Sequence, residues 1–262
     1  MNEAYLEDLA HVHDDSFGFI ARGAAKVLVQ KLREQGFGDG LVVELAVGSG
    51  ISSELITAAG YDVAGFDISA PMIELAERRI AARPEPPARF PGERLPGKAT
   101  FAVESLYDAE IPPCIAVTAI GEAFNYLFDP RAGFDAMSVV LGRAFEALAP
   151  GGLLVFDVAM PGRAQPRVEQ YFWEGDGWQV ISETVEAPAQ RRLERRITTT
   201  RRLAGEERVT RELHELALYD NEEIFELLRE IGFVPHTLAS YAEDFRFSAG
   251  HGGFLAAKPR TI

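Results

Sequence analysis

Cysteine is almost absent from this sequence, which has a single one, Cys114, in 262 residues. One thiol excludes a disulfide within the chain and any zinc site built from clustered cysteines. Neither a CxxC nor an HExxH spacing is present, so no bound metal is expected. A lone cysteine is typical of the reducing cytoplasm, which is where we expect the chain to be.

Positive charge and long apolar runs are also scarce. Lys and Arg number 26 against 40 Asp and Glu, which gives a formal net charge of -14. Nucleic-acid binding depends on basic contacts to phosphates, so no nucleic-acid partner is expected. No apolar run approaches the ~20 residues of a membrane helix, and the N-terminus lacks a signal-peptide pattern. We therefore expect a small-molecule partner and no membrane.

The clearest pattern in the chain is a short strand followed by a glycine loop. The run Leu41 to Val43 is typical of a strand buried on both faces, and Gly48-Ser49-Gly50 follows it. A helix is predicted over 52–59 and a second strand over 61–67. This order is typical of a nucleotide-binding βαβ unit, in which Asp67 is placed to accept a ribose hydroxyl.

Two nucleotide chemistries use this layout. A dinucleotide site needs Gly-x-Gly-x-x-Gly, but Ser53 stands where the third glycine would be. The segment Glu44-Leu-Ala-Val-Gly-Ser-Gly50 resembles the acid-x-x-x-Gly-x-Gly signature of class I S-adenosylmethionine (SAM)-dependent methyltransferases. Asp67 matches the acid at the end of their second strand, and the string 148–155 resembles the turn into their fifth strand. The resemblance covers about residues 40 to 160.

The resemblance implies an α/β fold, with a Rossmann-like, doubly wound, seven-stranded and mostly parallel sheet. An antiparallel β insertion is expected after the fifth strand. We expect an N-terminal helical lid segment at 1–39 and a SAM-binding core at 40–162. Residues 163–219 would be the insertion, as a lid or dimer contact, and 220–262 a helix and strands that complete the sheet. A homodimer through the insertion is one expectation.

The insertion has an alternating pattern that predicts three antiparallel strands, at 171–185, 191–203 and 208–219. Arginines gather here in an otherwise acidic chain. A strand with one solvated face explains them, and attraction of an anionic substrate or an acidic subunit is the alternative. They are Arg191, Arg192, Arg195, Arg196, Arg201, Arg202, Arg208 and Arg211.

The resemblance also implies a cofactor site. Glu44 would hold the glycine loop or, through water, the amino group of SAM, and Asp67 would accept both ribose hydroxyls. Ser105 stands where the family commonly has an aspartate beside the adenine, and core packing explains Met72 equally well. The expected cofactor-binding residues are Glu44, Ala46, Gly48, Gly50, Asp67, Ile68, Met72, Ser105, Leu106 and Ile120.

The methyl acceptor is expected beyond the strand predicted at 114–119, since ligands of open α/β sheets bind at the carboxyl ends of strands. Glu122 would orient or deprotonate the acceptor or, alternatively, stabilise its own loop. Asn125 and Tyr126 would hydrogen-bond the acceptor. His11 and His13 are either substrate or lid contacts or solvated surface residues.

These residues predict a SAM-dependent methyltransferase (EC 2.1.1.-) that methylates an O, N or C atom of a small molecule and releases S-adenosylhomocysteine (SAH). The sulfonium of SAM makes its methyl group electrophilic, so the protein mainly binds, aligns and excludes water. Two alternatives stay open. One is an NAD(P)-dependent oxidoreductase, against which Ser53 counts, and the other is a non-catalytic SAM-binding regulatory protein.

Overall fold

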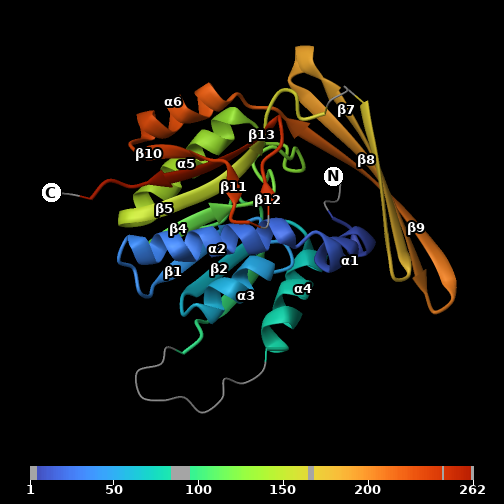
Figure 1. Cartoon of the computed structure of the whole chain (residues 1–262), viewed down its shortest axis with the longest axis horizontal. Helices are drawn as coiled ribbons and strands as arrows, with labels where there is room; N and C mark the ends of the chain where they lie inside the picture. The colour runs from blue at the N-terminus through green and yellow to red at the C-terminus, as the bar shows by residue number, and fades with distance from the viewer. Residues whose placement is uncertain (1–4, 84–94, 165–167, 244, 261–262) are drawn as a thin grey trace.

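The computed structural model describes residues 5–83, 95–164, 168–243 and 245–260. Seven strands form its main sheet (Figure 1): β1 (Leu41–Leu45), β2 (Asp62–Asp67), β3 (Ala99–Val103), β4 (Cys114–Ala119), β5 (Leu148–Ala159), β10 (Val234–Leu238) and β13 (His251–Ala257). The α-helices are α1 (Glu7–Ser16), α2 (Phe19–Glu34), α3 (Ile51–Ala58), α4 (Ala70–Ala81), α5 (Phe134–Ala147) and α6 (Asn221–Ile231).

The strand order of the main sheet is β10-β13-β5-β4-β1-β2-β3. Strand β13 runs antiparallel to both of its neighbours, and the remaining pairs are parallel. The order reverses between β1 and β4, which is where ligands of doubly wound sheets bind. The expected fold class, with its seven-stranded and mostly parallel sheet, is confirmed.

Helices cover both faces of the main sheet. On one face, α5 and α6 pack on inward residues such as Val43 and Val117, and on the other α2 and α3 pack on Val42 and Ala116. Alternate residues of β1 and β4 therefore enter two different cores, which is why these strands are apolar except for Glu44 and Thr118 near their carboxyl ends. The helices lie on opposite sides of the strands in Figure 1.

A second sheet, called here the lid sheet, projects from the carboxyl ends of the main strands (Figure 1). Its order is β6 (Val168–Gly175), β7 (Trp178–Ala187), β8 (Arg192–Leu203) and β9 (Glu206–Ala217), all antiparallel. The prediction of three strands was wrong. Residues 171–185 fold as a hairpin at Asp176-Gly177, where Gly175 pairs with Trp178 and Gly177 has a φ of +73°.

The N-terminal helix α1 lies between α4 and the lid sheet. Asp8 of α1 pairs with Arg201 and Arg208 on the lid sheet. At the other end of α1, Asp14 pairs with Arg79 of α4, and Asp15 accepts a hydrogen bond from Trp178 Nε1 at 3.0 Å. The helix therefore ties the lid sheet to the main domain.

The C-terminal part of the chain adds one helix cap and one short ribbon to this architecture. Asp220 caps α6, and its backbone N–H donates to the Glu223 carboxylate at 3.2 Å in a capping box. A two-stranded ribbon, β11 (Ser240–Tyr241) with β12 (Phe245–Arg246), was not predicted. Within the described ranges, no helix is long and apolar enough to cross a bilayer.

Candidate functional site

A cavity of about 1150 Å³, counted with its open mouth, lies at the carboxyl ends of β1, β2, β3 and β4. Every predicted cofactor residue except Gly50 lines it. Its wall also includes two residues predicted on the acceptor side, His13 and Tyr126. The predicted cofactor residues of the wall are Glu44, Ala46, Gly48, Asp67, Ile68, Met72, Ser105, Leu106 and Ile120.

The two glycines of the loop have different tasks. Gly48 has a φ of +57°, and a Cβ there would meet no atom within 4 Å, so its backbone is open to a ligand. Gly50 has a φ of +73°, and a Cβ would lie 2.9 Å from that of Ala76. Gly50 therefore permits close packing of α3 on α4, which is why it is absent from the cavity wall.

Glu44 holds the start of α3. The hydroxyl of Ser53 donates to its carboxylate, and both side chains are buried. Burial raises the pKa of Glu44 to about 7, although hydrogen bonds from Ser52 and Ser53 oppose the shift. Ser53 is the residue at the third glycine of the dinucleotide pattern. Its hydroxyl therefore has a structural partner, which explains why a serine stands there.

Asp67 is buried at the end of β2 beside the glycine loop. Its carboxylate accepts hydrogen bonds from the backbone N–H of Gly48 at 2.8 Å and of Ser69 at 2.9 Å. Burial raises the pKa of Asp67 to about 6, and these hydrogen bonds oppose the shift. A carboxylate has about four lone-pair sites, so Asp67 retains capacity for two ligand hydroxyls.

At the far end of the cavity, Ser105 follows β3. Its hydroxyl donates to Asp129 Oδ2 at 2.6 Å, and Asp129 is in turn paired with Arg131. Hydrogen bonding by Arg131 holds the pKa of Asp129 well below its usual range, although burial acts in the opposite sense. Asp129 lines the cavity and was not predicted from the sequence.

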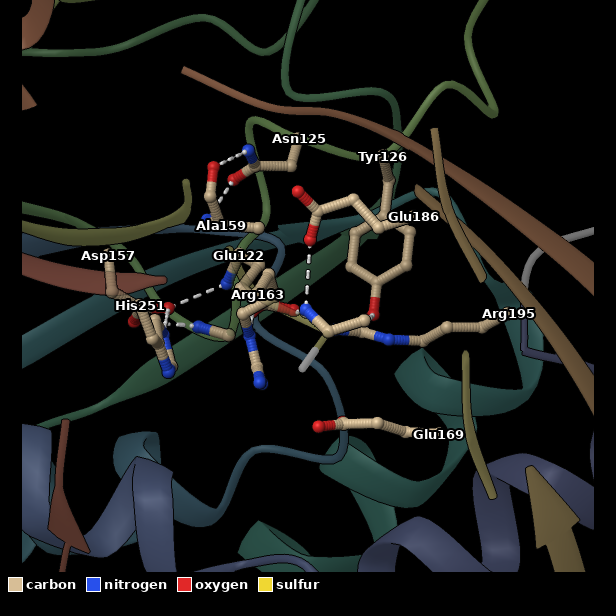
Figure 2. Close-up of polar contacts among 12 residues, drawn as sticks. Glu122, Asn125, Tyr126, Asp157, Ala159, Arg163, Glu169, Glu186, Arg195 and His251 are labelled. Atoms are coloured by element: carbon tan, nitrogen blue, oxygen red, sulfur yellow. Dashed lines mark hydrogen bonds and ion pairs between the residues drawn. The ribbon is translucent and has the colours of Figure 1, made fainter. Parts of the chain in front are cut away.

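Glu122 is held in an ion-pair network outside the cavity wall (Figure 2). Its carboxylate oxygens lie 2.5 Å from Arg163 Nε and 2.7 Å from Arg195 Nη2. Burial alone would raise the pKa of Glu122, but the two arginine charges outweigh it and hold the pKa well below its usual range. Such a carboxylate is a poor base, so the alternative of a loop-stabilising carboxylate fits the geometry better.

The loop that carries Glu122 is fixed by Asp157 at the end of β5. Asp157 accepts hydrogen bonds from the backbone N–H of Glu122 at 2.7 Å and of Gly121 at 2.9 Å. Tyr241 and His251 contact the same carboxylate, as Figure 2 shows for His251. The fixed loop accounts for the unusual φ of Glu122, +62°.

Asn125 does not reach the acceptor side. It is fully buried, and its amide nitrogen donates to the carbonyls of Ala159 and Ala217 at 2.8 and 2.6 Å. Its amide oxygen accepts from Ala159 N at 2.9 Å (Figure 2). Both donors are used, so the expected contact with an acceptor is corrected. Asn125 instead fastens the end of β9 to the end of β5.

Tyr126 and His13 lie in an aromatic wall of the cavity. The hydroxyl of Tyr126 is 3.2 Å from that of Tyr5, and Arg195 Nη1 donates to Tyr126 at 3.2 Å. Burial lowers the pKa of His13 to about 4, so its ring is neutral at neutral pH. Its Nδ1 finds no partner among the described residues. His11 is exposed and lies outside the wall, so the two histidines do not act together.

Neither explanation of the arginines in the insertion, a solvated strand face or attraction of an anionic substrate or acidic subunit, holds for the whole cluster. Arg196 is exposed, with 60% of its side chain accessible, as expected of a solvated strand face. Arg195 and Arg201 are instead largely covered, with 15% and 12% of their side chains exposed, and they pair with Glu122 and Asp8 of the same chain. In the part of the chain that is described, no group of three or more His, Cys, Asp or Glu could hold a metal ion.

Comparison with known proteins gives likeness in structure only. No family model and no curated protein matches the sequence. A SAM-dependent methyltransferase from Clostridium acetobutylicum has a TM-score of 0.75 at 17% identity, over 95% of this chain and 97% of that one. The sugar N-methyltransferase KedS8 from Streptoalloteichus gives 0.70 at 19%, over 99% and 94%. SAM-bound CalS10 from Micromonospora echinaspora, an amino pentose methyltransferase, gives 0.67 at 18%, over 98% and 99%.

The chain has the fold of SAM-dependent methyltransferases. Within this methyltransferase fold, sequence reasoning missed residues contributed by distant segments. Arg163 reaches Glu122 across 41 positions and Arg195 across 73, separations for which local patterns carry no signal. Asp129 lies near the predicted acceptor residues, but nothing in its sequence context points to Ser105.

Proposed function

We propose that the chain is a SAM-dependent methyltransferase (EC 2.1.1.-) that methylates an O, N or C atom of a small molecule. The observation that carries this proposal is the buried Asp67 beside the open backbone of Gly48. That pair occupies the wall of the large cavity, where a ribose and an amino-acid tail would lie next to each other. The methyltransferase fold of solved proteins over nearly the full chain supports it.

The residues of the cavity fit SAM. Gly48 leaves room for a ligand against the loop, and Asp67 has free lone pairs for ribose hydroxyls. Ile68, Met72 and Leu106 give apolar walls at the adenine end. On the same cavity, the buried Nδ1 of His13, which has no partner among the described residues, offers one more polar contact to a bound molecule.

When bound, SAM supplies an electrophilic methyl group, so the chain needs no strong base to activate it. The residues of the chain align the two reactants and exclude water. Tyr5 and Tyr126, hydrogen-bonded to each other at the acceptor end, would position the acceptor, with Arg195 holding Tyr126 in place.

A polar acceptor is favoured by the inner face of the lid sheet. Strand pairing places Glu169, Thr184, Arg195 and His214 in one row across its four strands. Directly paired residues share a face. Arg195 fixes which face this is, since it reaches Tyr126 on the cavity wall. KedS8 and CalS10 act on sugars or an amino pentose, and an amine on a hydroxylated ring would suit such a row.

Calorimetric titration with SAH and with NAD tests the proposal. The unchanged chain should bind SAH and not NAD, and Asp67→Ala should weaken SAH binding by at least about 100-fold, because two ribose contacts are lost. Asp62→Ala is the matched control, since Asp62 begins the same strand on an exposed position. Binding of NAD in place of SAH would favour the oxidoreductase.

Turnover separates an enzyme from a SAM-binding regulator. Release of SAH is measured while amines and alcohols on hydroxylated rings are offered together with SAM. An acceptor that is methylated supports the enzyme, and SAH binding without turnover of any acceptor favours the regulator. The pairing of Glu44 with Ser53 at the third glycine position already counts against a dinucleotide.

A homodimer through the outer face of the lid sheet is part of the proposal. That face exposes Val168, Phe172, Ile181, Val209 and Leu213. Apolar surface gathered on one sheet face is typical of a protein contact. Light scattering after size-exclusion chromatography should give twice the chain mass, and Phe172→Glu should give the monomer.

A further inference from the structure

The hydrogen bonds that Ser105 already makes at the adenine end of the cavity determine what it can offer to a ligand. A serine hydroxyl has one proton and two lone pairs. The proton of Ser105 goes to Asp129 Oδ2, 2.6 Å away. Asp129 cannot donate a hydrogen bond to Ser105, because it is ionised. Hydrogen bonds from Arg131 hold the pKa of Asp129 well below the usual range, although burial acts in the opposite sense. One lone pair of the hydroxyl accepts the backbone N–H of Tyr107 at 3.3 Å. Ser105 therefore faces the cavity with one free lone pair, as a hydrogen-bond acceptor and not as a donor.

Asp129 itself has no lone pair left for a ligand. Its Oδ1 accepts from Arg131 N and Nε, both at 2.9 Å. Its Oδ2 accepts from Ser105 at 2.6 Å and from Arg131 Nη2 at 2.5 Å. These four hydrogen bonds use the four lone-pair sites of a carboxylate. Of the two side chains, Ser105 is therefore the one that can receive a ligand donor.

The position of this pair indicates which part of a ligand it meets. The methionine part of SAM would lie at β1 and its ribose at Asp67 on β2, so the base continues to the end of the neighbouring strand β3. Ser105 and Leu106 follow β3, and they line the cavity together with Asp129. Adenine presents a donor on its 6-amino group, whereas hypoxanthine presents an oxygen there.

We propose that Asp129 is a positioning residue that fixes Ser105 as a hydrogen-bond acceptor and thereby selects a 6-amino purine over a 6-oxo purine. This inference rests on the proposed SAM-binding function. The carboxylate acts from the loop between β4 and α5, through a hydroxyl, and not directly from the end of β3. Arg131 secures it and is itself paired with Asp108 at 2.6 Å.

Calorimetric titration with two probes, SAH and S-inosylhomocysteine, tests the inference. The two probes differ at the 6-position of the base and at N1, which carries a proton in the inosyl compound. The unchanged chain should bind SAH roughly 10- to 100-fold more tightly, since the inosyl oxygen meets the lone pair of Ser105. Asp129→Ala and Ser105→Ala should lower this ratio several-fold, because the part of it that Ser105 contributes is lost. The ratio isolates the proposed role, because a merely structural role would weaken both probes alike.

Asp108→Asn is the matched control, since it disturbs the Arg131 pair on the exposed side and leaves Ser105 and Asp129 in place. It should keep the ratio of the unchanged chain. If Asp129→Ala does not fold, the ratio of Ser105→Ala decides alone. SAH binding with an unchanged ratio in either variant overturns this inference and leaves the proposed function intact. Failure of the unchanged chain to bind SAH contradicts the proposed function and the inference with it.

Discussion

The main sheet and the lid sheet are built on opposite principles. Every residue of β4 is buried and five of its six are apolar, so the main sheet is stabilised by removing apolar surface from water. The lid sheet buries polar groups on its inner face, such as Thr184 and His214, while Phe172 and Ile181 on its outer face are exposed. The main sheet is a scaffold, and the lid sheet carries specific contacts.

The contrast teaches where the specificity of such a molecule resides. An apolar core tolerates many sequences of suitable volume. An arginine that is largely withdrawn from water needs a carboxylate at hydrogen-bond distance, and Arg195 and Arg201 find theirs on the Glu122 loop and on α1. The position of the lid sheet relative to the main sheet therefore depends on a few charge pairs and on the Asn125 contacts, and each of these can be removed by a single substitution.

The largest effect is expected from Glu122→Ala. It leaves Arg163 and Arg195 without their shared carboxylate and should lower the free energy of unfolding by about 3–5 kcal/mol. Glu183→Ala removes an exposed partner of Arg196 and should cost less than about 1 kcal/mol. Urea unfolding of both variants measures the difference. Equal costs would mean that the inner pairs are no more important than surface ones.

A pair of leucines compares the two sheets directly. Leu154 in β5 is 1% exposed, and Leu154→Ala should cost about 2–5 kcal/mol through the cavity that it leaves. Leu213 on the outer face of the lid sheet is 39% exposed, and Leu213→Ala should cost less than about 1 kcal/mol in a monomer. A larger loss at Leu213 that grows with protein concentration would place it in a dimer contact.

The scaffold was predictable because its signals are local. Strand β4 has the predicted bounds, Cys114 to Ala119, and α4 begins at a local signal, the N-cap Ser69, which accepts a hydrogen bond from Met72 N. The same holds for the cofactor half, since Gly48 lies in the loop after β1 and Asp67 ends the adjacent β2, so the two meet at one edge of the sheet. The division of the chain into four segments stays a prediction.

The acceptor half was not predictable to the same degree. Asn125 looks like a polar loop residue, and only the arrival of Ala217 from β9 reveals that both of its donors are used. Glu122 likewise meets Arg163 and Arg195 from distant segments. The hairpin at Asp176-Gly177 is different, because an Asp-Gly pair is a local signal for a hairpin turn and could have been recognised in the sequence.

Asn125→Ala tests the uncharged hydrogen bonds that link β9 of the lid sheet to β5 of the main sheet. It removes three hydrogen bonds to backbone groups of Ala159 and Ala217, of which the Ala159 carbonyl keeps a second one from Tyr219 N, so the free energy of unfolding should fall by about 1–3 kcal/mol. Hydrogen exchange followed by mass spectrometry should become faster in β9 and stay unchanged in β1. Equal acceleration in both strands would contradict a local link.

The smallest effect is a pH dependence of SAH binding. The pKa of Asp67 is raised to about 6, chiefly by burial, so the carboxylate becomes ionised as pH rises through that value. The ionised form accepts ribose hydroxyls, so affinity should rise about tenfold between pH 5 and pH 7, following the ionised fraction. Asp67→Asn should be weaker and lack this step. Titration calorimetry at several pH values checks both, and affinity that falls over this range would have the wrong sign.

A crystal structure of the chain with SAH tests the central claim most directly. The account predicts both ribose hydroxyls within hydrogen-bond distance of Asp67, with the homocysteine part against the backbone of Gly48. SAH bound away from the carboxyl ends of β1 and β2, or with its ribose turned from Asp67, would contradict it.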